Sequence, residues 1–243
     1  MENIKIGHHI SGKFNNELED MRNKVLTMGG LVEQQIKRAV TAFSTADLEM
    51  AEQVIKLDDQ VDTLEIAIDH ECMQILALRQ PAAFDLRLLV TAIKIVNELE
   101  RVGDLAERIA KMAIQLSETG SNNRHEHYFE LVHMADLVEN MLHGALNVFA
   151  RMNVEDVTLI MDMDENVDRE YASIIRQLIT RMMEDQRNIT RMLDVLWVAR
   201  ALERIGDRAC NICEHLVYMV KGEDVRHLTH AELKMPKKQN LSN

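Results

Sequence analysis

An all-α fold of two tandem, internally duplicated three-helix bundles is predicted by three features of the sequence. Helix-breaking residues are scarce, with two prolines and nine glycines in 243 residues, and aromatic residues make up only 4%. Apolar residues recur at spacings of three and four over long stretches, as on the buried face of an amphipathic helix. The chain also matches itself in order along its two halves, which is typical of a duplicated structural unit.

The duplication is visible as two ordered sets of matches. At an offset of 106 residues, Met28 matches Met134 and Asp58 matches Asp164. Beyond Pro81 the offset falls to 103, and there the motif LERVGD at 99–104 matches LERIGD at 202–207. We therefore expect a first repeat over 8–117, a second repeat over 125–221 and a polar tail over 222–243.

Each repeat is expected to hold three helices in an up-down-up arrangement. The expected helices cover about 17–44, 47–78 and 83–116 in the first repeat, and about 126–151, 154–184 and 188–221 in the second. Pro81 is expected to end the second helix, because proline lacks the N–H that the helix ladder needs. Asn153 is a good N-cap residue for the helix that follows it.

The apolar stripes support these helices. The third helix of the first repeat carries Leu88, Ala92, Ile95, Leu99, Val102, Ala106, Ile109, Ala113 and Leu116, and that of the second carries Val195, Val198, Leu202, Ile205, Ala209, Ile212, Leu216 and Met219. Spacings of three and four without polar interruption predict that both helices are buried along one face.

Charge and cysteine content narrow the class of protein. The formal net charge is −12, which argues against a surface for nucleic-acid phosphates. The three cysteines imply no disulfide framework, and Cys210 and Cys213 are interpreted as helical thiols rather than a zinc or redox pair. We expect no signal peptide in Met1–Ile10 and no membrane span, and hence a cytoplasmic protein.

Paired carboxylates are the most informative feature of the sequence. In the first repeat Asp58 and Asp62 are four residues apart, and so are Glu100 and Asp104 on the next helix. Side chains at this spacing share one helix face, where like charges repel. In the second repeat the equivalent residues are Asp164, Asp168, Glu203 and Asp207. If adjacent helices present these pairs to one another, a proton or a bound cation must offset the repulsion.

The ligand set would consist of oxygen atoms alone. Such a site favours a hard ion, and Mg²⁺, Mn²⁺, Ca²⁺ or iron suits it better than zinc or copper, with Mg²⁺, Mn²⁺ or iron expected first. Gly103 and Gly206 support close approach of another helix or a ligand, since glycine costs about 1 kcal/mol inside a helix. The alternative is a pair of solvated acidic edges, in which Arg101 and Arg204 pair with the aspartates three residues later.

The combined motif pattern resembles that of the PhoU proteins, the accessory and regulatory proteins of phosphate-specific transport systems. Each repeat carries two (E/D)xxxD motifs, and the resemblance covers about residues 8–225, including the opening His9–Gly12 segment, Met28–Gly30 and both LER(V/I)GD motifs. One departure is visible, because Glu65 has Tyr171 as its counterpart and the two sites need not hold identical ions.

The resemblance implies two related three-helix bundles, metal binding at the eight carboxylates and a role in phosphate signalling without catalysis. It implies a negative regulator of the phosphate-starvation response and of phosphate uptake. The implied partners are the ATPase subunit of the phosphate ABC transporter and a sensor histidine kinase, through which the protein would reach the membrane. A homodimer is a further expectation of the resemblance.

Two other functions compete with this interpretation. One is a carboxylate-bridged di-metal enzyme, although such bundles normally supply Glu-x-x-His pairs that are lacking at the carboxylate positions. The sequence also shows no evident nucleophile, general base or phosphate-binding glycine loop. The other is a purely structural helical scaffold whose acidic edges bind no metal.

Overall fold

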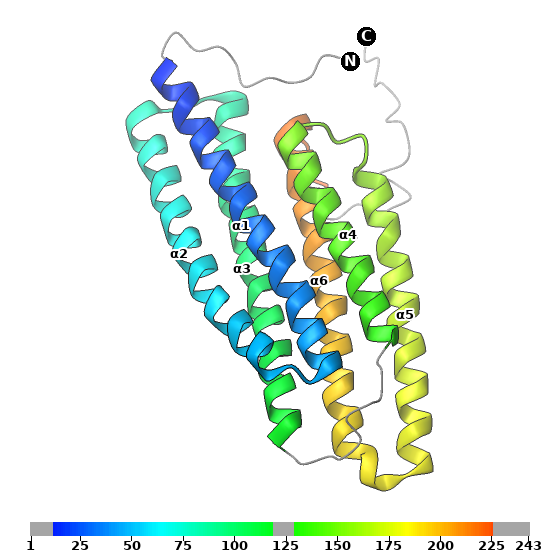
Figure 1. Ribbon diagram of the computed structural model, residues 1–243. Helices are drawn as coiled ribbons and strands as arrows, with labels where there is room; N and C mark the ends of the chain where they lie inside the picture. The colour runs from blue at the N-terminus through cyan, green and yellow to red at the C-terminus, as the bar shows by residue number, and fades with distance from the viewer. Residues whose placement is uncertain (1–11, 119–128, 226–243) are drawn as a thin grey trace, which may run out of the picture.

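The computed structural model describes residues 12–118 and 129–225. The opening His9–Ser11 segment and most of the expected tail therefore lie outside the described residues. Within the described part six long helices form two bundles, α1–α3 and α4–α6 (Figure 1). They are α1 (Gly12–Thr45), α2 (Leu48–Arg79), α3 (Ala83–Glu118), α4 (Phe129–Arg151), α5 (Val157–Glu184) and α6 (Ile189–Lys221), with a short 3₁₀ helix, η1 (Gln186–Asn188), before α6. The predicted all-α, duplicated three-helix fold is confirmed.

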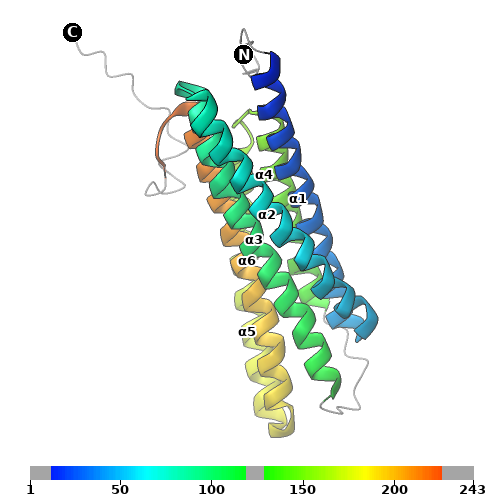
Figure 2. The ribbon, with the colours of Figure 1, turned by 90° about the vertical axis from the view of Figure 1, so that its left-hand side faces the viewer.

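The helices run roughly along one common axis, so that the molecule is elongated in both views (Figure 2). Within each repeat the three helices pack against one another, and the repeats are joined by contacts of α1 with α4 and of α3 with α6. The apolar stripe of α3 is fully buried from Leu88 to Ile109, and the stripe of α6 is buried from Val195 to Met219. These two stripes confirm the faces predicted from spacing.

Helix ends follow local chemistry. Asp47 caps α2, because its side chain accepts a 3.0 Å hydrogen bond from the backbone N–H of Met50. Gln80 ends α2 in the left-handed conformation directly before Pro81, as the proline predicted. None of the described helices is long and apolar enough to span a membrane.

The prediction for Asn153 is wrong. The Asn153 side chain instead closes a turn, accepting from the backbone N–H of Glu155 at 3.1 Å and donating to the Glu155 carboxylate at 3.0 Å. Helix α5 begins only at Val157, and its N-cap residue Asp156 makes no side-chain cap bond. Asparagine favours such local turns as strongly as helix N-caps, so the sequence alone does not distinguish the two.

Candidate metal centres

The first acidic cluster lies where α2 packs against α3. Asp58 and Asp62 project from α2, and Glu100 and Asp104 project from α3. Gly103 lets the helices approach here, because a Cβ atom at this position would lie 3.0 Å from Asp58 Oδ1. The close approach expected from the helical glycine is therefore confirmed.

Asp58 is the buried member of this cluster, with only 9% of its surface exposed. The amide Nε2 of the fully buried Gln35 donates a 2.9 Å hydrogen bond to Asp58 Oδ1. Burial raises the pKa of Asp58, the bond from Gln35 opposes this, and nearby carboxylates including Asp62 and Asp104 raise it further. Gln35 thus holds one carboxylate of the cluster from the core side, a role that the sequence did not suggest.

The exposed rim of the cluster is crowded with negative charge. Burial raises the pKa of Glu100 to about 7, and the charges of Asp104, Glu65 and Asp62 add to the shift. Burial followed by the charge of Asp62 also raises the pKa of Asp104. At neutral pH and without a bound cation, Glu100 is therefore protonated in part of the molecules.

Two further carboxylates belong to this first cluster. Glu65 follows Asp62 by three residues on α2, and its pKa is raised by burial and by Asp69, Asp62 and Asp104. Glu107 follows Asp104 by three residues on α3, and its charge raises the pKa of both Asp58 and Asp104. The i,i+3 spacing of both residues was a signal in the sequence, and Glu107 was missed.

The second acidic cluster repeats this geometry between α5 and α6. Asp164 and Asp168 lie on α5, and Glu203 and Asp207 lie on α6. A Cβ atom at Gly206 would lie 3.2 Å from Asp164 Oδ1, so this glycine also permits close helix approach. Burial raises the pKa of Glu203, followed by the charge of Asp207, and burial followed by Asp168 raises the pKa of Asp207.

The two clusters differ in their charge balance. In the second, Arg200 Nη1 donates to Glu203 Oε1 at 2.5 Å, and the same guanidinium lies 5.7 Å from the ring centroid of Tyr171. Tyr171 stands where the first repeat has Glu65, and Cys210 stands where it has Glu107. The second cluster thus has fewer carboxylates and an internal cation.

The thiol of Cys210 is not readily ionised. Burial, followed by the charge of Asp164, raises the pKa of Cys210, and burial raises the pKa of Cys213 to about 12. All three cysteines are free, and Cys72 and Cys213 are fully buried in helices.

The donor chemistry of both clusters fits a hard cation. The ligands are carboxylate oxygens on adjacent helices, and Glu203 Oε2 is buried without a hydrogen-bond partner among the described residues. In their present conformations, however, no three acidic, histidine or cysteine side chains of the described chain are gathered closely enough to hold an ion.

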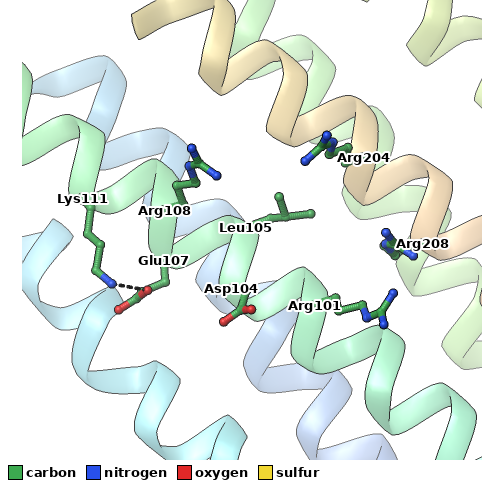
Figure 3. A pocket seen from close by; sticks show the side chains of 8 residues that line it. All are labelled: Arg101, Asp104, Leu105, Glu107, Arg108, Lys111, Arg204 and Arg208. Atoms are coloured by element: carbon green, nitrogen blue, oxygen red, sulfur yellow. Dashed lines mark hydrogen bonds and ion pairs between the residues drawn. The ribbon is translucent and has the colours of Figure 1, made fainter.

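The alternative pairing of Arg101 and Arg204 with the following aspartates is not found. Within residues 12–118 and 129–225 neither arginine forms an ion pair with Asp104 or Asp207. Both line a groove between α3 and α6, as Figure 3 shows. Their charges still act on the clusters, because Arg101 lowers the pKa of Glu100 and Arg204 lowers the pKa of Glu203 and Asp207.

Comparison with known proteins places the chain in a family. A family model described as "PhoU domain" matches residues 25–113 and 131–216, one segment in each repeat and together well over half of the chain. The chain belongs to the PhoU family. The family resemblance seen in the motifs is thus confirmed.

Individual PhoU relatives are similar over nearly the whole chain. A Pseudomonas putida protein named "Phosphate-specific transport system accessory protein PhoU homolog" is 50% identical over 91% of this chain and 86% of its own length. The crystal structure of PhoU from Pseudomonas aeruginosa has 48% sequence identity and a TM-score of 0.81, covering 86% of this chain and all of that one. The crystal structure of the phosphate transport system regulatory protein PhoU from Streptococcus pneumoniae has 32% identity and a TM-score of 0.79, covering 87% and 99%.

Proposed function

We propose that this PhoU-family protein is a metal-binding regulatory adaptor of phosphate-specific transport. The proposal is supported by two equivalent helix pairs of a PhoU fold, on each of which burial and neighbouring carboxylates raise the pKa of acidic residues, as at Glu100 and Asp207. Such crowding is stabilised when a cation binds. The relatives named as accessory or regulatory proteins of phosphate transport support the biological setting.

The metal would be held by eight carboxylates. They are Asp58, Asp62, Glu100 and Asp104 in the first repeat, and Asp164, Asp168, Glu203 and Asp207 in the second. Mg²⁺, Mn²⁺ or iron suits these oxygen ligands. A bound ion would supply positive charge at each cluster and would join α2 to α3 and α5 to α6.

We further infer that the protein acts by contact with partners. The proposed partners are the ATPase subunit of the phosphate ABC transporter and the sensor histidine kinase of the phosphate response. Through them a homodimer in the cytoplasm would restrain uptake and hold the starvation response off when phosphate is plentiful.

A carboxylate-bridged di-metal enzyme is the second candidate, and the structure gives it less support. No histidine follows any of the eight carboxylates by three residues, whereas helical-bundle di-metal enzymes supply Glu-x-x-His pairs. Turnover of oxygen or of a phosphate ester that is lost with the cluster would favour the enzyme over the adaptor.

Metal analysis tests the proposed ligands. Protein purified without chelator should contain metal, and the Asp62→Ala, Glu100→Ala, Asp104→Ala triple variant should lose the share bound to the first cluster. Unchanged metal content in the triple variant would refute the site assignment.

A matched control removes the same number of charges elsewhere. Glu19, Glu49 and Glu52 are exposed carboxylates outside both clusters, so their triple replacement by alanine should leave metal content unchanged. Circular dichroism of both variants establishes that the helical fold is retained.

Genetic and binding experiments test the adaptor. Deletion of the gene should leave starvation genes expressed at high phosphate, and the wild-type gene should restore repression where the cluster variant does not. Pulldown with the transporter ATPase, with and without metal, tests direct contact. Normal repression in the deletion strain would count against the regulatory role.

A further inference from the structure

A groove of about 420 Å³ between α3 and α6 concentrates positive charge in an otherwise acidic protein. Helix α3 contributes Arg101, Arg108 and Lys111, and α6 contributes Arg204 and Arg208, while only two carboxylates line the same groove (Figure 3). The formal net charge of the whole chain is −12. A local excess of cations against that background marks a surface suited to an anion.

Two of the five cations already have carboxylate partners. Lys111 Nζ donates to Glu107 at 2.5 Å, and Arg208 Nη1 donates to Glu98 at 3.2 Å. A third, Arg108, lies 5.5 Å from the ring centroid of Trp197, which leaves its positive charge uncompensated.

Arg101 and Arg204 are the groups that a ligand would find available. Both side chains are exposed, and within the described chain neither donates to a carboxylate. They occupy the same position of the duplicated LER(V/I)GD motif, so the packing of α3 on α6 brings two equivalent arginines to one groove. The five cations that line one groove repel one another, and a bound anion would offset this repulsion.

We propose that this groove binds an oxyanion of the phosphate type, held by the arginines that line it, with Arg101 and Arg204 as two that have no carboxylate hydrogen-bond partner within the described residues. A guanidinium presents paired N–H donors in a plane, which matches two oxygens of a phosphate group. Arg101 and Arg108 on α3 and Arg204 and Arg208 on α6 place such donors on both walls of the groove (Figure 3). The ligand class deepens the proposed function and rests on it, because it gives the regulator a direct contact with phosphate.

The groove also shares residues with the first acidic cluster. Asp104 and Glu107 line it, and the negative charges of both raise the pKa of Asp58 in the cluster. In the metal-free protein these charges oppose an incoming anion. A cation bound at the first cluster would neutralise them, so metal and phosphate should each raise the affinity for the other by the same factor.

Equilibrium dialysis with radiolabelled inorganic phosphate tests the site on the full-length protein. Metal-free and Mn²⁺-loaded samples are compared, and metal content is measured in each. The Mn²⁺-loaded protein should bind phosphate, and the Arg101→Gln and Arg204→Gln single variants should each bind it about tenfold or more weakly.

A control with the same change in net charge uses the exposed Arg151 and Arg176, which lie outside the groove. The Arg151→Gln, Arg176→Gln double variant should bind phosphate as the wild type does, whereas the Arg101→Gln, Arg204→Gln double variant should not. Equal binding by the two double variants would place the anion on the metal or elsewhere and would overturn the groove site.

The comparison of metal-free with Mn²⁺-loaded protein distinguishes failure of the metal-binding proposal from failure of the anion-site proposal. A protein that takes up no metal refutes the metal-binding function itself. A metal-loaded protein that binds no phosphate refutes the groove site alone. Phosphate affinity that is the same with and without Mn²⁺, but lost in the groove variant, retains the anion site and refutes its coupling to the metal.

Discussion

Arg200 forms a 2.5 Å ion pair with Glu203 in the second acidic cluster, and the equivalent position in the first repeat is Asn97. One duplicated site thus carries its own cation, whereas in the other burial and neighbouring carboxylates raise the pKa of Glu100 to about 7. The Arg200 guanidinium also lies over Tyr171, which replaces the Glu65 carboxylate of the first cluster. The second cluster therefore differs from the first at two neighbouring positions. Tyr171 replaces an acidic residue there, and Arg200 adds a cation that contacts Tyr171.

This difference predicts unequal metal affinities. The first cluster should bind a divalent ion more tightly, and Arg200→Asn should strengthen binding at the second. The gain should be about fivefold, because a partly exposed ion pair contributes about 1 kcal/mol or less. Calorimetric titration with Mn²⁺ should resolve two classes of site that approach each other in the variant. A single class of equal sites in the wild type would contradict the prediction.

The pKa of Glu100, raised to about 7 by burial and by Asp104, predicts pH-dependent stability. Between its ordinary value of 4.5 and about 7, the folded metal-free protein binds this proton more tightly than the unfolded chain. Stability contributed by the protonated group is therefore present at low pH and is lost as pH rises through about 7. Thermal unfolding of metal-free protein across this range measures the effect.

Glu100→Gln supplies the control for this pH dependence. Glutamine cannot ionise, so the variant should lose less stability over the same pH range than the wild type does. Metal affinity of the wild type should rise with pH through about 7, because the ion must displace the proton. A pH dependence of stability that is equally steep in the variant would show that another group is responsible.

Gly103 and Gly30 offer a matched pair of helix glycines. No atom lies within 4 Å of a Cβ placed at Gly30, so Gly30→Ala should stabilise the protein by about 0.5–1 kcal/mol through helix propensity. At Gly103 a Cβ would meet Asp58 Oδ1 at 3.0 Å and Gln35 Oε1 at 3.2 Å. Gly103→Ala should therefore lose this gain and weaken metal binding at the first cluster. Chemical unfolding and metal titration measure both; equal stabilisation by the two variants would contradict the close approach.

Gln35 has a natural comparison in the second repeat, where the equivalent residue is Met141. Gln35→Met keeps a similar volume but removes the donor to Asp58, so the free energy of unfolding should fall by about 1 kcal/mol at neutral pH. Because the buried carboxylate loses its bond, the pKa of Asp58 should rise further and metal should bind the first cluster more weakly. NMR titration of Asp58 checks the first effect, and an unchanged pKa would show that the bond contributes little.

The fold was predictable because its main determinants are periodic. The stripes on α3 and α6 repeat every three or four residues over many turns. Helix α2 ends just before Pro81, because proline has no backbone N–H to continue the helix. The start of α5 was not predictable, since Asn153 can close a local turn as readily as it caps a helix. Where such a helix begins also depends on which residues are buried, and here the buried Val157 is the first residue of α5.

The acidic clusters were partly predictable for the same reason. Spacing of four places Asp58 with Asp62, and Glu100 with Asp104, on single helix faces, and duplication repeats the pattern. Contacts between helices have no regular spacing in the sequence, so the hydrogen bond from Gln35 on α1 to Asp58 on α2 could not be predicted. Nor could the groove formed where the two repeats meet, because Arg101 and Arg204 are 103 positions apart.

The contact between the repeats joins equivalent helices, α1 with α4 and α3 with α6. It is an isologous contact inside one chain, of the type that otherwise relates the subunits of a symmetric pair. One repeat alone would accordingly present a self-complementary face, on which a protein of single-repeat length could assemble with its own copy. Joined in one chain, the two halves are free to differ, as they do where Arg200 in the second repeat stands opposite Asn97 in the first.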